Sequence, residues 1–365
     1  MPIDTDPALS ALIVSFAVSL LIVLTQRWHG HLSHDLHSGV QRQHLAATPR
    51  VGGIALWSGL SAGYLMCQDE HQLCGTVIAV GTPAFMVGLW EDVTKSVSVR
   101  MRLAITMVGG LIGWSFTGYS LDHLHTPFLD DLLAFPLVSI ALTCFAIAGV
   151  ANAINIIDGF NGLASGTVVV SASAFFLLAE QAGDAELMMA CGILITAVAG
   201  FIVINWPRGK LFLGDGGAYL AGTALGWLAV MFNARIPEVS AWAMLLICAY
   251  PIQEVLFSIW RRRSRKMHWG DPDRLHLHSL VGRRVVNPCM PWASRTTRNS
   301  VTGLLMLLAS ALPAAWALMW PNNHPMLMAG FLTYIMGYRL IYARLVRFAW
   351  TKQPRPNAQG HWRRT

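Results

Sequence analysis

An all-α membrane protein with about eleven transmembrane helices is the fold that the sequence predicts, and three observations predict it. Hydrophobic residues make up 54% of the 365 residues, whereas charged residues make up only 12%, about half the share of an ordinary soluble domain. The mean hydropathy is +0.49. Long uncharged apolar runs recur along the whole chain. Such a composition excludes a single water-soluble core, and it excludes intrinsic disorder, which requires few apolar residues.

Each expected span is an apolar run of 16 to 21 residues, close to the roughly 20 that cross a hydrocarbon core of ~30 Å. Runs this long exclude a β-barrel, whose strands alternate apolar and polar residues. The first run follows the acidic segment MPIDTDP, whereas a signal peptide begins with positive charge, so we expect the run to remain as a membrane helix. We expect one domain over residues 1–365. Its expected spans are 8–25, 51–67, 75–90, 103–119, 132–150, 162–179, 187–205, 216–233, 239–259, 300–320 and 326–343.

Basic residues predict which loops face the cytoplasm. Of the 26 Lys and Arg residues, 24 lie on one predicted side of the membrane. The positive-inside rule makes that side cytoplasmic, with a periplasmic N-terminus and a cytoplasmic C-terminus in a bacterial inner membrane. The net charge of +7 is therefore a topology signal, and no nucleic-acid partner is expected. The expected cytoplasmic segments are 26–50, 91–102, 151–161, 206–215, 260–299 and the basic tail 344–365.

Acidic residues are informative on the same side. Eight of the 19 lie in the predicted cytoplasmic loops or at cytoplasmic ends of spans, and none is predicted at mid-bilayer. An acid at the end of a membrane helix is costly unless it binds something. The eight are Asp35, Glu91, Asp92, Asp158, Asp215, Glu254, Asp271 and Asp273.

Four polar clusters on this side carry the candidate chemistry: GLWEDVTK, NAINIIDGFNGL, KLFLGDGGAYLAG and DPDRLHLHSLVGRR. In the second cluster, Asn152, Asn155 and Asp158 follow i, i+3, i+6 spacing, which places them on one helix face. The candidate site residues of the four clusters are Asp92, Lys95, Asn155, Asp158, Asn161, Phe212, Asp215, His276, His278 and Arg283.

These residue types suit a diphosphate substrate held with Mg²⁺. Carboxylate oxygens suit Mg²⁺, which is usually held by one or two carboxylates together with substrate phosphates. Phosphoryl transfer depends on positioning and on neutralising charge more than on covalent help from the protein. The Gly214–Gly217 turn opens a predicted helix, whose N-terminus favours anions, and the basic histidine loop offers donors to a diphosphate.

Each motif alone also has a plain structural interpretation. A lone Asp at a helix end is more often an N-cap, and a glycine-rich helix start is more often a site of close packing. An HxH pair in a basic loop is more often surface decoration, and no Cys/His set at zinc spacing accompanies it. The sequence contains no P-loop, Rossmann or GxSxG signature. What favours one site is the joint occurrence of four clusters on one predicted side.

These residues resemble the bacterial polyprenyl-phosphate N-acetylhexosamine-1-phosphate transferases of the glycosyltransferase 4 family. That family contains the first lipid-linked enzymes of peptidoglycan, enterobacterial common antigen and O-antigen synthesis. The resemblance runs from Thr48–Gly53 to His276–Ser279, and the motifs NxxNxxDGxxGL and FxGDxG carry most of it. It implies a cytoplasmic UDP-N-acetylhexosamine, undecaprenyl phosphate in the lipid bilayer, UMP as a product, and Mg²⁺ as the cofactor, with Mn²⁺ as the alternative ion.

The resemblance also implies roles for individual residues. It implies that Asp215 binds the metal and that Asp92 joins it there, deprotonating or orienting the lipid phosphate, with Asp158 as a further catalytic acid. The implied substrate-binding residues are Lys95, Asn155, Phe212 beside the uracil, His276 and His278. Asn161 and Arg283 are further substrate-binding candidates, taken from the Asn/Asp cluster and from the basic histidine loop.

Four positions depart from the family pattern. Glu91 replaces the first Asp of an Asp-Asp pair, so Asp92 is the stronger candidate, and Asn161 replaces a second acid, so it cannot act as a base. Ala218 and Ser279 replace a common Ser and a His. Three consecutive histidines, expected of the peptidoglycan branch, are missing. The sequence therefore favours UDP-N-acetylglucosamine or a related donor over the muramyl-pentapeptide donor, which remains an alternative.

The main rival from another class is a secondary transporter, in which ionisable groups and broken helices lie near mid-membrane. Pro136 and Pro251 are the nearest candidates for helix breakers. Glu254, one turn beyond Pro251, either lines the site or faces Arg261 or Arg262. The sequence does not decide whether Cys67 and Cys74 form a disulfide. It also does not decide whether the chain forms a homodimer.

Overall fold

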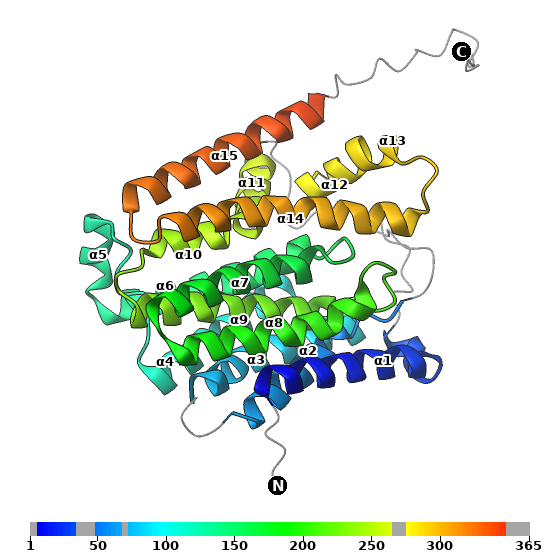
Figure 1. Ribbon diagram of the computed structural model, residues 1–365, viewed down its shortest axis with the longest axis horizontal. Helices are drawn as coiled ribbons and strands as arrows, with labels where there is room; N and C mark the ends of the chain where they lie inside the picture. The colour runs from blue at the N-terminus through cyan, green and yellow to red at the C-terminus, as the bar shows by residue number, and fades with distance from the viewer. Residues whose placement is uncertain (1–5, 34–47, 68–71, 265–274, 348–365) are drawn as a thin grey trace.

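The computed structural model describes residues 6–33, 48–67, 72–264 and 275–347, and in these ranges the chain is helical, with no strand (Figure 1). The basic tail from 348 onward, and the predicted loop acids Asp35, Asp271 and Asp273, lie outside the described residues. The helices are α1 (Pro7–Ser33), α2 (Gly52–Leu65), α3 (Gln72–Thr94), α4 (Val99–Thr117), α5 (Pro127–Leu133), α6 (Pro136–Ile157), α7 (Leu163–Ala182), α8 (Ala185–Asn205), α9 (Gly214–Arg235), α10 (Ala241–Ile247), α11 (Ala249–Ser264), α12 (Leu277–Val281), the π-helix η1 (Gly282–Val286), α13 (Asn287–Cys289), α14 (Arg295–Met319) and α15 (His324–Arg347).

Each expected span overlaps a helix, and eight helices of the described ranges are long and apolar enough to cross a membrane: α1, α3, α6, α7, α8, α9, α14 and α15. The predicted polytopic all-α class is confirmed at this level. Helix α2 has only 14 residues, and α4 begins with Arg100 and Arg102 in its first turn, so neither meets the same standard. The count of eleven crossings therefore stays a prediction.

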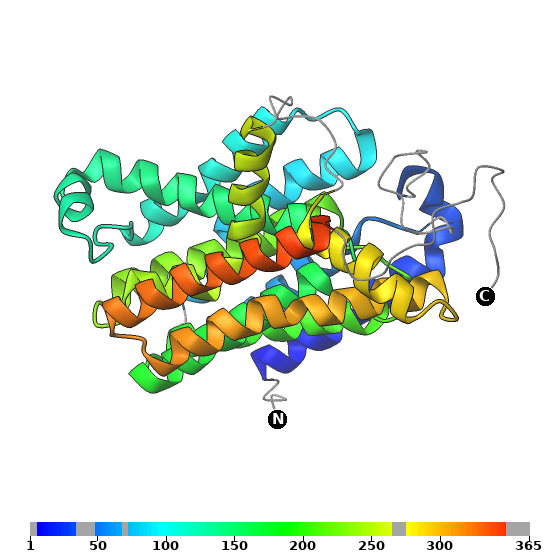
Figure 2. The same cartoon turned by 90° about the horizontal axis from the view of Figure 1, so that it is seen from above.

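The ninth expected span, 239–259, is a broken helix. Helices α10 and α11 are bent by 78° at a break between Ile247 and Ala249. Pro251 lies in the first turn of α11, where the missing N–H costs no helical hydrogen bond. Seen from above in Figure 2, α11 (yellow-green) stands across the long direction of α14 and α15. The bend turns the α11 half of this element across the other helices.

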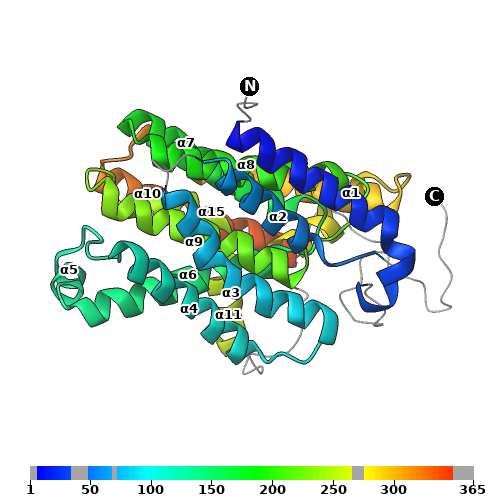
Figure 3. The same ribbon diagram turned by 90° about the horizontal axis from the view of Figure 1, so that it is seen from below.

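Helix α9 is the centre of the bundle (Figure 3), packed against α2, α3, α6, α7 and α8. Almost every residue from Gly214 to Asn233 is buried, the main exception being Asp215 in its first turn. Small side chains such as Gly222 and Gly226 line this helix, and small residues allow membrane helices to approach closely. The position of Asp215 is therefore set by the most enclosed helix of the fold.

The bundle has two ends, which we call the site end and the far end. At the site end α3 and α6 finish and α9 begins, while at the far end α7 finishes and α15 begins. In Figure 1 the far end carries α5, and α12 and α13 lie at the opposite side. A Cβ placed on Gly63, near the end of α2, would lie 3.1 Å from Pro7 O, so α1 begins at the far end. Because α15 ends at the site end, the two described termini lie at opposite ends of the bundle.

Candidate active site at the start of helix α9

The turn before α9 is held by backbone pairing with a segment far away in the chain. Phe212 N donates to Pro49 O (2.9 Å), and Gly52 N donates back to Phe212 O (2.9 Å). Gly214 then adopts φ +74°, a left-handed conformation that favours glycine. A Cβ at this position would lie 2.0 Å from Arg50 O. The TPRVGG and FLGDGG motifs therefore form one unit that begins α9.

Asp92, from the end of α3, caps the N-terminus of α9. Its two carboxylate oxygens accept the N–H groups of Asp215 (3.0 Å) and Gly216 (2.9 Å). These are donors that a helix leaves free in its first turn. The side chain of Asp92 is buried, with 1% of its surface exposed. Close approach of the two backbones permits this contact, because a Cβ on Gly88 would lie 2.6 Å from Gly216 Cα.

The end of α6 supplies two further polar groups. Asn155 Nδ2 donates to Asp215 Oδ1 (3.2 Å), and the Asp158 carboxylate accepts the N–H of Gly214. Burial raises the pKa of Asp158 to about 7, and the neighbouring Asp215 carboxylate adds to the rise, while Arg50 and the Gly214 N–H oppose it. The structure thus brings Asp92, Asp158 and Asp215, the three predicted catalytic acids, to one turn.

Two arginines that the sequence analysis left without a site role lie against Asp215. Arg50 Nη2 is 3.6 Å from Asp215 Oδ1, and the Arg102 guanidinium donates to Asp215 Oδ2. Arg102 also lies 3.9 Å from Glu91 Oε1, and its guanidinium lies over the ring of Tyr219 at 6.0 Å. From the sequence, both arginines count only as topology signals, because nothing in the local sequence of Arg102, for example, identifies a partner 113 positions away.

Two predicted binding residues frame this turn. Lys95 is exposed at the end of α3, with φ +54°, and its Nζ is 3.9 Å from Asp92 Oδ1. Phe212 is partly buried and takes part in the backbone pairing described above. Both residues therefore lie beside the first turn of α9.

The histidine motif is held by Glu254 of α11. Glu254 Oε2 accepts from His276 Nδ1 (3.1 Å), and Oε1 accepts the N–H of Leu277 (3.0 Å). His278 contacts the Asn/Asp motif: its ring meets that of Phe160 edge-on at 5.6 Å, and a Cβ on Gly159 would lie 3.9 Å from its Nε2. His278 therefore adjoins Gly159, the residue that follows Asp158. Of the two interpretations left open for Glu254, contact with the site motif is the one that the structure supports.

Two predicted substrate-binding residues make their described side-chain contacts away from the turn that begins α9. Asn161 is buried, and its Nδ2 donates to Ser300 Oγ (3.1 Å) and to Pro207 O (3.4 Å). It therefore ties the turn before α7 to the start of α14. Arg283 is exposed, and its Nε donates to Ser279 O within its own turn (3.1 Å). Substrate contact by these two residues stays a prediction.

The donor set at this turn fits one Mg²⁺ ion that is bound mainly through its substrate. Within the described ranges no group of three His, Cys, Asp or Glu side chains converges to hold a metal. The Asp215 carboxylate is the candidate metal ligand here, and the guanidinium groups of Arg50 and Arg102 and the amide of Asn155 lie against it. Mg²⁺ commonly takes one or two carboxylates, several waters and substrate phosphates. Asp92 retains unused lone pairs while it caps α9, because each carboxylate oxygen has two.

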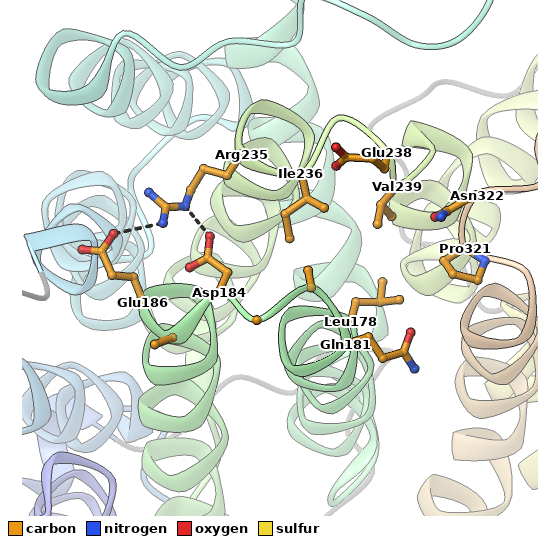
Figure 4. Close-up of a pocket in the computed structure, with 13 residues that line it drawn as sticks. Leu178, Gln181, Asp184, Glu186, Arg235, Ile236, Glu238, Val239, Pro321 and Asn322 are labelled. Carbon is orange, nitrogen blue, oxygen red and sulfur yellow. Dashed lines mark hydrogen bonds and ion pairs between the residues drawn. The ribbon is translucent and has the colours of Figure 1, made fainter.

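A separate cavity of about 640 Å³ lies at the far end (Figure 4). Arg235, at the end of α9, donates to Asp184 (2.7 Å) and lies 3.1 Å from Glu186 Oε2, and Glu238 and Asn322 also line the cavity. None of the predicted site residues lies there. Cys67 and Cys74, also in the far half of the molecule, are both free thiols in this structure.

Comparison with known proteins finds a matching family and several similar sequences. The profile described as Glycosyl transferase family 4 matches residues 75–233, from α3 to α9. The chain is 30% identical over 285 residues, 75% of its length and 73% of the relative's, to the undecaprenyl-phosphate alpha-N-acetylglucosaminyl 1-phosphate transferase of Yersinia pestis. It is 29% identical over 280 residues (75% and 78%) to a probable undecaprenyl-phosphate N-acetylglucosaminyl 1-phosphate transferase of Bacillus subtilis (strain 168). A third similar protein, from Escherichia coli O157:H7, carries the same name as that of Yersinia pestis, at 25% identity over 315 residues (85% and 83%).

Proposed function

Because the chain belongs to glycosyl transferase family 4, we propose that it is a phosphotransferase that moves N-acetylhexosamine 1-phosphate from a UDP-sugar to undecaprenyl phosphate. The products are undecaprenyl-diphospho-N-acetylhexosamine and UMP. The observation that carries the proposal is the convergence of Asp92, Asp158 and Asp215 on the first turn of α9, since these acids come from three helices far apart in the sequence. An anionic substrate beside a helix N-terminus and two arginines is a favourable arrangement.

The reaction exchanges one diphosphate linkage for another. An oxygen of the lipid phosphate bonds to the β-phosphorus of the UDP-sugar, and the bond from that phosphorus to the bridging oxygen breaks, so that UMP leaves with the electron pair. Arg50 and Arg102, which lie at Asp215, are placed to neutralise charge on the phosphate oxygens. Asn155 fixes the rotamer of the Asp215 carboxylate. Holding two reactants in line supplies much of the acceleration such a transfer needs.

A bound Mg²⁺ at Asp215 would add a Lewis acid that draws charge from the diphosphate. Asp215 and Asn155 are the residues that would hold it, with Asp92 as a further candidate. The contacts of Asp92 with the backbone of α9 support a positioning role, because a lipid phosphate is already ionised near pH 7 and needs no strong base.

The proposed placement in the membrane puts the site end at the cytoplasmic surface of a bacterial inner membrane. Eleven crossings, with the broken element counted as one, would leave the N-terminus in the periplasm and the C-terminus in the cytoplasm. The described termini at opposite ends of the bundle support an odd number of crossings. A transporter is the weaker alternative: α10 and α11 do form a broken helix, but the acids of the site gather at one end of the bundle.

UDP-N-acetylglucosamine is the proposed donor, on the strength of the names of the similar proteins and of the missing third histidine. Purified protein in detergent should be incubated with undecaprenyl phosphate and a series of radiolabelled UDP-sugars, and label in the lipid phase and UMP release should be measured together. We expect both signals with UDP-N-acetylglucosamine and neither with Asp215→Asn. Lipid labelling with UDP-MurNAc-pentapeptide alone would move the chain to the peptidoglycan branch, and no UMP release from any donor would overturn the proposal.

A further inference from the structure

The far ends of α2 and α3 each carry a thiol. Cys67 follows the end of α2, and Cys74 lies in the first turn of α3, seven positions later in the chain. The two helices lie side by side (Figure 3). They meet closely here, because a Cβ on Gly75 would lie 2.8 Å from the ring of Tyr64. The connection between α2 and α3 therefore has one cysteine at each of its ends.

These two thiols are in direct contact. The side chains of Cys67 and Cys74 are hydrogen-bonded to each other, and the Cys67 thiol also donates to Gly63 O at 3.5 Å. Two sulfurs within hydrogen-bonding reach can be joined by small side-chain rotations, whereas more distant cysteines need backbone movement to form a bond. Cys74 is buried, with 4% of its surface exposed, and Cys67 is partly exposed, so an oxidant meets Cys67 first.

The side of the membrane decides whether such a pair stays reduced. In the proposed orientation the site end faces the cytoplasm, so the far end and both thiols face the periplasm. Disulfides form and persist in the bacterial periplasm and are rare in the cytoplasm. Cys289, in α13 at the site end, is an exposed thiol on the opposite side and provides an internal reference.

We propose that Cys67 and Cys74 form a disulfide that joins the far ends of α2 and α3. The proposal rests on the orientation in the membrane that accompanies the proposed function. At their site ends the same two helices contact the turn that begins α9: Gly52 of α2 pairs with Phe212, and Asp92 of α3 caps α9. A covalent bond at the far end keeps these two helices in register along their length.

The oxidation is a thiol–disulfide exchange with a disulfide-bearing oxidant of the periplasm. The Cys67 thiolate attacks one sulfur of the oxidant's disulfide, and the other oxidant sulfur leaves as a thiolate. The Cys74 thiolate then attacks Cys67 Sγ, which forms the Cys67–Cys74 bond and expels the second oxidant thiolate. The chain loses two electrons and two protons, and the oxidant is reduced to a dithiol.

Maleimide labelling of the wild-type protein tests the proposal. Free thiols in isolated membranes are blocked with one maleimide under denaturing conditions, and the protein is then reduced, treated with a heavier maleimide and digested with trypsin. The tryptic peptide 51–95 contains Cys67 and Cys74 and no other cysteine. We expect this peptide to carry two heavy labels and no light label, whereas Cys289 carries the light label. Light label on both cysteines of the peptide would overturn the proposal.

A second measurement separates the disulfide from the orientation. In the Cys74→Ser variant the Cys67 thiol has no disulfide partner next to it, and a membrane-impermeant maleimide should label it in intact spheroplasts. Labelling only after lysis would overturn the orientation and the disulfide together. UMP release is measured on the same membranes, so a chain that transfers sugar phosphate but keeps both thiols reduced defeats the disulfide alone. A chain that contains the disulfide but releases no UMP defeats the proposed function alone.

Discussion

The carboxylate of Asp92 accepts the backbone N–H of Asp215, 123 positions further along the chain, at 3.0 Å. One acid therefore fixes the helix turn that presents the other. This contact connects α3 with α9 at the site. Asp92 holds the first turn of α9 through its backbone, and Asp215 is the acid whose side chain that turn presents.

Asp92→Asn should lower transfer at least about a hundredfold, and it should cost about 1–3 kcal/mol of stability, because an amide can accept at only one of the two positions that bind Asp215 N and Gly216 N. Glu91→Gln should cost much less, since Glu91 binds Val97 N (2.8 Å) and contacts Arg102 from outside the turn. Initial rates and melting curves of the two variants give the comparison. The reverse order of activity would contradict the assignment.

Arg102→Lys should lower kcat/KM for the UDP-sugar by about tenfold or more. A lysine ammonium is a point charge and cannot reproduce the planar fork that reaches Asp215 while lying near Glu91. Arg100→Lys, two residues earlier and exposed, is the matched control and should retain wild-type kinetics. Equal effects of the two changes would indicate that only the overall charge of this segment matters.

Gly214→Ala should destabilise the protein by at least about 2 kcal/mol and abolish transfer, because a side chain there is strained at φ +74° and would collide with Arg50 O. Gly149→Ala offers the control, since a Cβ on Gly149 meets nothing within 4 Å. That variant should melt at the wild-type temperature or above it, as alanine favours a helix. Melting curves in detergent distinguish the two glycines, and unchanged melting of Gly214→Ala would refute the strained turn.

A pH effect on stability is expected at the far end. Burial lowers the pKa of His125, and the neighbouring His324 and His123 lower it further. The ring of His125 stacks on that of His324, with centroids 4.3 Å apart. The folded state therefore takes up a proton less readily than the unfolded chain, and stability should fall as the pH drops below about 6.5. Melting temperatures between pH 5 and 8 should show this fall in the wild type and a smaller one in His125→Gln.

Much of the architecture was predictable because apolar length is a local property. Each of the eleven runs overlaps a helix, since a chain that must satisfy its backbone within lipid has few alternatives to helix. The break after Ile247 was harder to predict, because Pro251 lies four residues after Ile247, inside the first turn of α11, where proline is tolerated. The short α2 was also hidden, as composition alone does not reveal where a helix ends.

The part of the site that was predictable is the part that charged residues and sequence motifs identify. Asp92, Asp158 and Asp215 were expected together and lie together, because an acid at the end of a membrane helix is costly unless it binds something, and the four clusters lie on one predicted side. The partners of these residues were not predictable. Arg102 and Glu254 occur in segments whose composition fits a membrane boundary equally well, and only the three-dimensional packing shows which side chains they contact.

Helix α9 is anchored at both extremities: Asp92 binds its first turn, and Arg235 in its last turn is paired with Asp184 and Glu186. A shift of α9 along its own axis would break the contacts at both of its ends at once. The helix is therefore held in place along its length. Any movement that accompanies turnover should therefore be sought in helices other than α9, while the turn that carries Asp215 keeps its position.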